Sequence, residues 1–100
     1  MQHISLLALP SCLTTSISLP LEILNAANEL ARIRNRKQAP LTIDIVGEKI
    51  GPIVTAGGLS VMSTATPATI RQTDLLILPS LWRNPMTTIR QQQWLLPWLS

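Results

Sequence analysis

The apolar residues of this chain gather in short runs that end at prolines. Residues 4–9 form one nearly continuous apolar run before Pro10, and residues 75–78 form another before Pro79. Runs of this length predict strands that are covered on both faces, as in a parallel sheet. We expect residues 75–78 to lie in the middle of such a sheet.

A third segment, residues 41–46, alternates instead of being apolar throughout. Its apolar positions share one face and its polar positions the other: Leu41, Ile43 and Ile45 against Thr42 and Asp44. A strand with one polar face is typical of a position nearer the edge of the sheet. Residues 53–56 and 59–62 flank Gly57-Gly58, which predicts a β-hairpin.

Two segments predict helices. The first begins at Ser18 as N-cap, with Pro20 in the first turn where proline is tolerated. Its apolar positions recur at helical spacing and its polar positions lie opposite: Ile23, Leu24, Ala27, Leu30 and Ala31 against Glu22, Asn25, Glu29 and Arg32. The acidic side chain of Glu22 suits a first turn. The second helix opens at Asn84-Pro85 and ends before Pro97.

The predicted order is strand, helix, strand, hairpin, strand, helix, with no interior domain boundary. This order indicates an α/β fold, a flavodoxin-like three-layer sandwich with a mainly parallel sheet and a β-hairpin. Residues 1–100 then form the N-terminal part of a single domain, because the last helix should cross over to a further parallel strand. We expect the fold to be C-terminally incomplete, with its open edges paired to a second copy or to the rest of a longer polypeptide.

Composition narrows the chemistry. Hydrophobic residues make up 46% of the 100 positions, yet no run reaches the length of a membrane span and no signal peptide is evident, which indicates a cytoplasmic protein. The formal net charge is +3, with half of the cations in one predicted helix end, where they suit the helix dipole better than a phosphate backbone. One cysteine, Cys12, and one histidine, His3, leave no disulfide, no cofactor motif and no metal site to predict.

Candidate binding residues follow the ends of two predicted strands. Cys12 and Ser16 come after the first strand, and Ser80 and Trp82 come after the strand at 75–78. Since ligands bind at the carboxyl edge of open α/β sheets, these side chains could line a pocket there. The alternative is that Cys12 is a small loop residue, that the serines bond to local backbone, and that Trp82 packs at the sheet end.

Several segments, in this order and spacing, resemble the PfpI/ThiJ superfamily, whose fold is like that of class I glutamine amidotransferases. The resemblance extends in particular to the N-terminal sensor domain of AraC-type transcriptional regulators. It rests on the strand ending LALP, the helix start SLPLEILNAANEL, the strand LTIDIVG, the hairpin GGLSV, the strand DLLILPS and the pair Trp94-Leu95.

The resemblance implies a non-catalytic protein. Enzymes of the superfamily use a cysteine on a strand-to-helix turn, which would lie beyond Ser100, and an acidic side chain at the position that holds Ser16 here. A glycine pair of the family is replaced by Ser80-Leu81. Regulators of this type keep the fold as a module that senses a small-molecule effector and forms homodimers. Their helix-turn-helix part contacts DNA, and nothing in this chain corresponds to it.

The predicted ligand-binding residues are therefore Cys12 and Trp82, from their places after strand ends, together with Ser16, Ser80 and Leu81. We expect no catalytic residue among them. The alternative function is a fragment of a PfpI/ThiJ-type cysteine enzyme, similar to an isonitrile hydratase, an amidase or a glyoxalase.

Overall fold

The structure is a computed structural model that describes residues 3–34, 41–70, 72–81, 92 and 94. The second predicted helix, from Asn84, and the candidate site residue Trp82 lie outside the described residues. Among the described helices, none has both the length and the apolar character that crossing a membrane requires.

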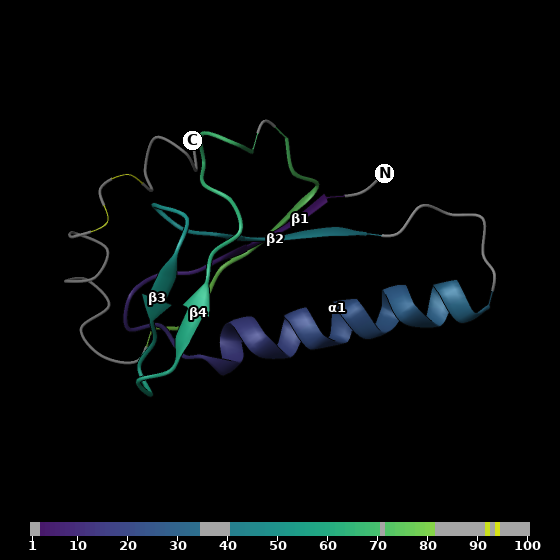
Figure 1. Cartoon of the computed structure of the whole chain (residues 1–100), viewed down its shortest axis with the longest axis horizontal. Helices are drawn as coiled ribbons and strands as arrows, with labels where there is room; N and C mark the ends of the chain where they lie inside the picture. Colours follow the sequence, from purple (N-terminus) through teal and green to yellow (C-terminus); the bar gives the residue numbers. More distant parts are fainter. Residues whose placement is uncertain (1–2, 35–40, 71, 82–91, 93, 95–100) are drawn as a thin grey trace.

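A parallel sheet forms the centre of the fold (Figure 1). Strand β1 (His3–Leu7) lies between β2 (Thr42–Val46) and β5 (Leu75–Ile77) and pairs with both in parallel. All of β1 beyond its first residue is buried, which explains its continuous apolar run. The predicted α/β architecture with a parallel sheet and a hairpin is confirmed.

The two outer strands differ in how well their positions were predicted. Strand β2 lies at an edge, as its polar face indicated. Strand β5 was expected in the middle of the sheet, but in the described part of the chain it borders β1 alone. Its flanking leucines are correspondingly open, with Leu75 51% and Leu78 60% exposed. The apolar run correctly predicted a strand, but it did not predict which of the two apolar strands is central.

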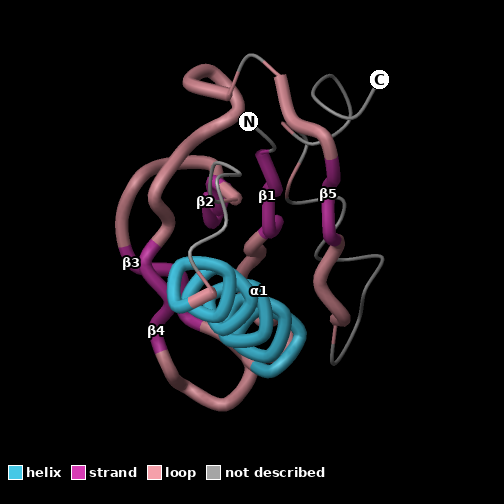
Figure 2. Tube along the Cα trace, turned by 90° about the vertical axis from the view of Figure 1, so that its right-hand side faces the viewer, coloured by secondary structure: helices cyan, strands magenta, loops and turns pink. Residues whose placement is uncertain are grey.

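Helix α1 (Thr15–Ile33) covers one face of the sheet, as Figure 2 shows. It begins earlier than predicted, so Ser18 is not its N-cap and Pro20 lies inside it. Its first turn contains no acidic residue, which corrects the role expected for Glu22. Pro20 has no N–H to donate to the carbonyl of Ser16 in the preceding turn, yet the helix continues through it to Ile33.

The face that α1 turns to the sheet also differs from the predicted stripe. Ile17 is buried, and Leu21 and Leu24 pack against the core. Ile23 and Leu30, placed in the predicted stripe, are 64% and 48% exposed. The helix carries aliphatic side chains on two opposite sides, so periodicity alone could not tell which side faces the sheet.

Asn28 lies on the side of α1 that faces the sheet, and its side chain connects the helix to the start of β2. Its side-chain nitrogen donates to the carbonyl of Leu41 at 2.9 Å, and its side-chain oxygen accepts from the Leu41 N–H at 2.8 Å. Leu41 directly precedes β2, so these hydrogen bonds hold the start of this edge strand against α1. One amide side chain thus satisfies both polar groups of a backbone unit that the sheet leaves unpaired.

The hairpin consists of β3 (Pro52–Val54) and β4 (Ser60–Met62), which pair antiparallel. The predicted hairpin is confirmed. Its register places Ile53 opposite Val61, which is shifted by one residue from the register that a two-residue turn at Gly57-Gly58 would give. Gly58 has φ 85°, and its N–H donates to the carbonyl of Thr55 at 3.0 Å. A three-residue loop with glycine in the left-handed region therefore replaces the expected tight turn.

The hydrophobic core lies between β1, α1 and the loop that joins them. Its buried residues include Ile4, Leu6, Leu7, Ala8, Leu9, Cys12, Ile17 and Ile45. Ile53 and Val61 of the hairpin pack against this cluster, which fixes the hairpin to the same core.

Gly47 lies where the chain leaves β2 and passes under the hairpin. A methyl group there would lie 2.7 Å from Ile53 Cδ1 and 3.1 Å from Ser63 Cβ. Ser63 is 3% exposed and held by hydrogen bonds to the 49–51 turn, so it cannot move away freely. We expect Gly47→Ala to lower the free energy of unfolding in urea by about 1–3 kcal/mol.

The matched control is Gly57→Ala, because a methyl group at Gly57 meets nothing within 4 Å. Its effect should stay within about 0.5 kcal/mol of zero. Equal losses in the two variants would show that the close packing around Gly47 does not matter.

Candidate functional site

Two loops meet at the carboxyl edge of the sheet because their strands are neighbours there. The loop after β1 runs back along the segment that follows β5, so that Cys12 and Leu81 form an antiparallel bridge. The N–H of Leu13 donates to the carbonyl of Ser80 at 2.7 Å. The structure therefore brings Cys12, Ser80 and Leu81 together, as adjacent parallel strands require.

The hairpin closes the other side of the same loop. The Ser11 N–H donates to the Val54 carbonyl at 3.0 Å, and the Ala56 N–H donates to the Cys12 carbonyl at 2.8 Å. Ser11 adopts φ 65°, a left-handed conformation that is uncommon outside glycine and turns the chain sharply after Pro10. Cys12 is thus held by backbone hydrogen bonds between the hairpin and the segment after β5.

The Cys12 side chain is fully buried by this arrangement, with an exposed fraction of 0%. Burial raises the pKa of the Cys12 thiol, since the thiolate would lose its hydration. The three segments that meet here, residues 8–16, 54–56 and 78–81, contain no charged side chain. Backbone hydrogen bonds at Leu9 and Cys12 lower the pKa of the thiol, but burial outweighs them. The described surroundings therefore suit a packed thiol better than a nucleophile.

Ser16 lies in the first turn of α1, and its hydroxyl is already engaged. Its Oγ donates to the carbonyl of Leu13 at 2.6 Å, a local bond common at helix starts. Ser80 is exposed, whereas Leu81 is half-buried against the core. Of the predicted site residues that the structure describes, Ser80 presents the most accessible polar side chain.

Sequence reasoning missed two hydroxyls at this edge. The Oγ1 atoms of Thr14 and Thr55 lie 2.5 Å apart. Thr55 Oγ1 donates to the Leu59 carbonyl at 2.8 Å, so the proton between the two threonines comes from Thr14. Thr55 belongs to the hairpin, and no local pattern signals that a hairpin will pack beside the loop before α1.

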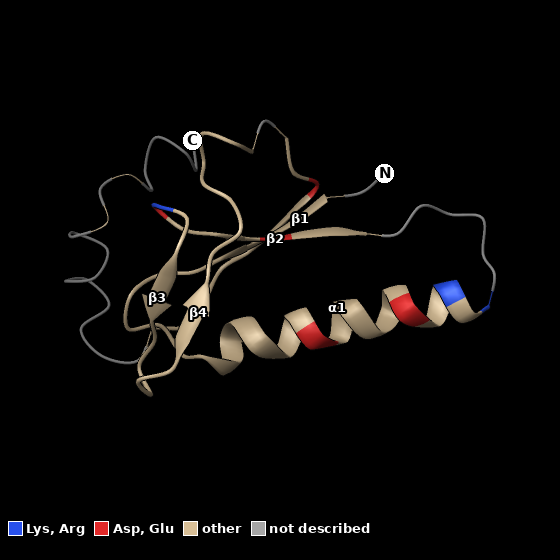
Figure 3. Ribbon diagram, viewed as in Figure 1, with Lys and Arg blue, Asp and Glu red and all other residues tan. Residues whose placement is uncertain are grey.

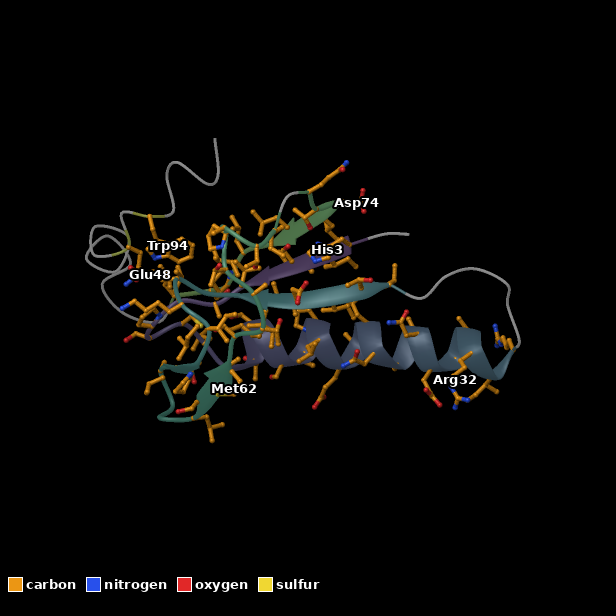
Figure 4. The ribbon with its side chains drawn as sticks, turned by 45° about the horizontal axis from the view of Figure 1, so that its top comes forward. His3, Arg32, Glu48, Met62, Asp74 and Trp94 are labelled. Carbon is orange, nitrogen blue, oxygen red and sulfur yellow. The ribbon has the colours of Figure 1, made fainter. Side chains whose placement is uncertain are left out.

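A second polar cluster lies at the amino end of the sheet (Figure 4). The His3 ring contacts Asp44 Oδ2 through Nε2 at 2.7 Å and Thr73 Oγ1 through Nδ1 at 2.9 Å. Ser5 Oγ donates to Thr73 Oγ1 at 3.0 Å, and Thr64 Oγ1 donates to Asp44 Oδ1 at 2.9 Å. The carboxylate, imidazole and hydroxyls together link β1, β2 and the segment before β5.

This cluster contains the residue types of a catalytic site, but its side chains are already engaged in hydrogen bonds. Thr73 Oγ1 also lies within hydrogen-bonding distance of the His3 and Leu75 carbonyls, and Asp74 accepts the His3 backbone N–H at 2.7 Å. Within the described residues, every buried side-chain nitrogen or oxygen has a hydrogen-bond partner. The cluster therefore fixes the strand starts and presents no unengaged nucleophile.

Charged side chains otherwise lie along α1, in the turn after β2 and at the amino end of the sheet (Figure 3). No group of three potential metal ligands occurs among the described residues. The part of the carboxyl edge that the structure describes thus carries no charged side chain and presents hydroxyl and backbone groups, with the Cys12 thiol buried beneath them. These groups can hydrogen-bond to a small polar molecule, and the described residues of this edge include no histidine or carboxylate.

The fold defined by these elements is α/β, with a three-stranded parallel sheet, an antiparallel pair and a partial DJ-1-like architecture. No family model matches the chain, and no curated protein matches it at a significant level. Solved structures do match, and they bear out the resemblance to AraC-family regulators and DJ-1/PfpI proteins.

An AraC family transcriptional regulator from Pseudomonas putida is 18% identical with a TM-score of 0.69, over 95% of this chain and 56% of that chain. A protein described as a transcriptional regulator from Vibrio parahaemolyticus is 26% identical with a TM-score of 0.74, over 98% of this chain and 49% of that chain. A DJ-1 superfamily protein from Agrobacterium tumefaciens is 21% identical with a TM-score of 0.52, over 80% of this chain and 38% of that chain. The chain therefore spans about half the length of the two regulators.

The burial of Cys12 predicts a slow thiol. Alkylation by iodoacetamide should be slower in the folded protein than in urea by on the order of a hundredfold, because the loop must open first. Ser80→Cys is the control, since it places a thiol at an exposed position of the same edge and that thiol should react at the rate of a free cysteine. Equal rates for Cys12 in the folded and unfolded chain would contradict the burial.

The His3–Asp44 contact predicts an acid-sensitive fold. The hydrogen bond from His3 holds the pKa of Asp44 below its ordinary value of 3.8. A lowered pKa in the folded state means that ionised Asp44 stabilises the fold above that value, and the contribution is lost as the pH falls below it. At pH 7, Asp44→Asn should cost about 1–2 kcal/mol in urea unfolding.

The same variant should lose less stability than the wild type between pH 5 and pH 3, a range about one unit either side of that ordinary value. Glu22→Gln, which changes an exposed carboxylate of α1, should follow the wild-type curve. If the stability of Asp44→Asn and that of the wild type fell equally with pH, ionised Asp44 would not be what stabilises the fold.

Proposed function

We propose that this chain is an effector-sensing part of an AraC-type transcriptional regulator and that it is not catalytic. The observation that carries the proposal is the neutral carboxyl edge, where the Cys12 thiol is fully buried without an acidic or imidazole neighbour in the described loops. A fold shared with two solved regulators supports it. The DNA-reading step would belong to a helix-turn-helix region of the regulator.

The effector in this proposal is a small polar molecule. Ser80 is exposed at the edge, and the hydroxyls of Thr14 and Ser16 lie in the loop and turn beside it. With no charged side chain in these segments, recognition would rest on hydroxyl and backbone hydrogen bonds, with apolar contact to Leu81. Sensing is then a change in loop packing and involves no covalent step.

The test is thermal unfolding of the chain in the presence of single amino acids, polyols and small amides. A binder should raise the melting temperature, since a ligand at a hundred times its Kd adds about 2.7 kcal/mol of stability. Ser80→Ala should weaken this response by removing an edge hydroxyl. Ser60→Ala, which changes an exposed serine of β4, is the matched control and should leave the response intact.

The DJ-1 superfamily match keeps one competing function in view, a cysteine enzyme similar to an isonitrile hydratase, an amidase or a glyoxalase. That function predicts turnover of isonitriles, amides or methylglyoxal, with the nucleophile supplied by the cysteine that the resemblance expects beyond Ser100 and not by the buried Cys12. Turnover of this kind would refute the non-catalytic proposal, and the absence of any stabilising compound would refute effector binding.

A further inference from the structure

The β3–β4 hairpin is joined to its surroundings at two separate places. At its base, Ser63 Oγ accepts the Gly51 N–H at 2.9 Å and donates to the Lys49 carbonyl at 2.6 Å, in the turn that follows β2. Its tip, residues 54–58, lies beside the start of α1 and away from the parallel sheet (Figure 1). The hairpin is a two-stranded sheet of its own. Its tip can therefore move without breaking the pairing of β1 with β2 or β5.

Little apolar packing holds the hairpin down. Val54, Leu59 and Met62 are 58%, 64% and 58% exposed. In the two strands, which the structure describes in full, Ile53 and Val61 pack against the core and are half-buried. A two-stranded hairpin is at best marginally stable by itself. The seating of the tip therefore depends on the hydrogen bonds that it makes.

Three hydrogen bonds hold the tip against the loop that precedes α1. Two are the backbone bonds at Ser11 and Cys12, and the third joins the hydroxyls of Thr14 and Thr55. Thr55 has an exposed fraction of 3%, whereas the hairpin residues on either side of it are exposed. The contact of the tip with the loop thus centres on one buried side chain.

The hydroxyl of Thr14 serves this contact in place of its usual local one. Thr14 is the N-cap residue of α1, yet its side chain makes no capping hydrogen bond. A threonine at this position ordinarily accepts a hydrogen bond from a backbone N–H of the first helical turn. Here its proton goes to Thr55. Release of the tip would leave the Thr14 hydroxyl available to another partner.

The seated tip covers one side of Cys12, and the bridge to Leu81 covers another. The base of the hairpin provides a place to pivot. Gly51 has φ 146°, a conformation that glycine alone adopts readily, and a Cβ atom there would meet nothing within 4 Å. Hinges are a few such residues at the end of an element. Lifting the tip would uncover Cys12 and Thr14 while α1 and the parallel sheet stay in place.

We propose that the hairpin is a strap that pivots at its base and opens the carboxyl edge, with the Thr14–Thr55 hydroxyl pair holding it closed. The open form adds the Thr14 hydroxyl to the exposed Ser80 as a group that a small polar molecule can reach. The inference rests on the proposed function, because it names the movement that admits the proposed effector.

The first test uses iodoacetamide, itself a small amide, as the probe of the open form. If the strap opens locally, the rate of Cys12 alkylation is proportional to the population of the open form. Thr14→Val removes the hydroxyl and keeps a side chain of similar shape. It should speed alkylation about five- to tenfold, the factor that a lost hydrogen bond is worth. Its circular dichroism should match that of the wild type.

Thr55→Val should also speed alkylation. The double variant Thr14→Val/Thr55→Val should react no faster than Thr55→Val alone, because both changes remove the same bond. Rates that multiply in the double variant would overturn the role of the hydroxyl pair, as would an unchanged rate in Thr14→Val.

Asn28→Ala is the control for global unfolding. It removes the two hydrogen bonds between α1 and Leu41 and lies outside the hairpin and its contacts. Its Cys12 should react at the wild-type rate. An increase as large as that in Thr14→Val would show that the thiol is reached by unfolding of the whole chain, which would refute the strap.

The second test is amide hydrogen exchange. The N–H groups of Ser11 and Ala56, which bond across the contact, should share one protection factor. It should be at least about tenfold lower than that of Ala8, whose N–H donates to the Val46 carbonyl at 2.9 Å beside the parallel sheet. Thr14→Val should lower the first two by the factor seen in alkylation and leave Ala8 unchanged. Equal protection at all three amides would overturn the proposal.

None of these measurements contains an effector. A hairpin that stays closed would therefore refute the strap and leave effector binding to the melting experiment. A strap that opens in a chain that no compound stabilises would uphold the movement and refute the proposed effector.

Discussion

The structure depends on one strand that hydrogen-bonds along both edges and is buried on both faces. The residues of β1 from Ile4 to Leu7 are buried, whether they point toward α1 or away from it. Even Ser5 has an exposed fraction of 0%, and its hydroxyl therefore needs the partner that Thr73 provides. Covering such a strand requires parallel neighbours on each side, a helix on one face and packed segments on the other.

The position of the loop after β1 follows from the same strand arrangement. Because β5 is the parallel neighbour of β1, the segments that follow them emerge at the same edge and pair through Cys12 and Leu81. The hairpin then packs on the free side of the loop through Ser11 and Ala56. The burial of the thiol is thus a consequence of strand order, and no separate feature of the loop sequence explains it.

Sequence patterns predicted the elements better than their boundaries and orientation. The apolar run of β1 and the alternation of β2 report burial directly, so a buried strand and an edge strand could be recognised, but the equally apolar run of β5 was wrongly placed in the middle of the sheet. The start of α1 could not, because Thr14, Thr15, Ser16 and Ser18 are all residues that favour N-caps. Its inner face was ambiguous for a different reason: Leu24 and Ile23 belong to opposite aliphatic rows.

The candidate site divides in the same way. Cys12, Ser80 and Leu81 could be placed together from strand order alone, since carboxyl ends of parallel neighbours share an edge. The contact between Thr14 and Thr55 depends on where the hairpin packs, which local sequence does not encode. The His3 cluster was missed because its members come from four segments, and Thr73 is 70 residues from His3.

The two polar regions of the sheet therefore have different physical roles. At the amino end, carboxylate, imidazole and hydroxyl groups are engaged with one another and hold the strands in register. At the carboxyl edge, the thiol is sealed in while Ser80 stays exposed and the described surface carries no charge. Helix α1 begins at this edge, so its first turn, which contains Ser16, borders the place proposed for an effector.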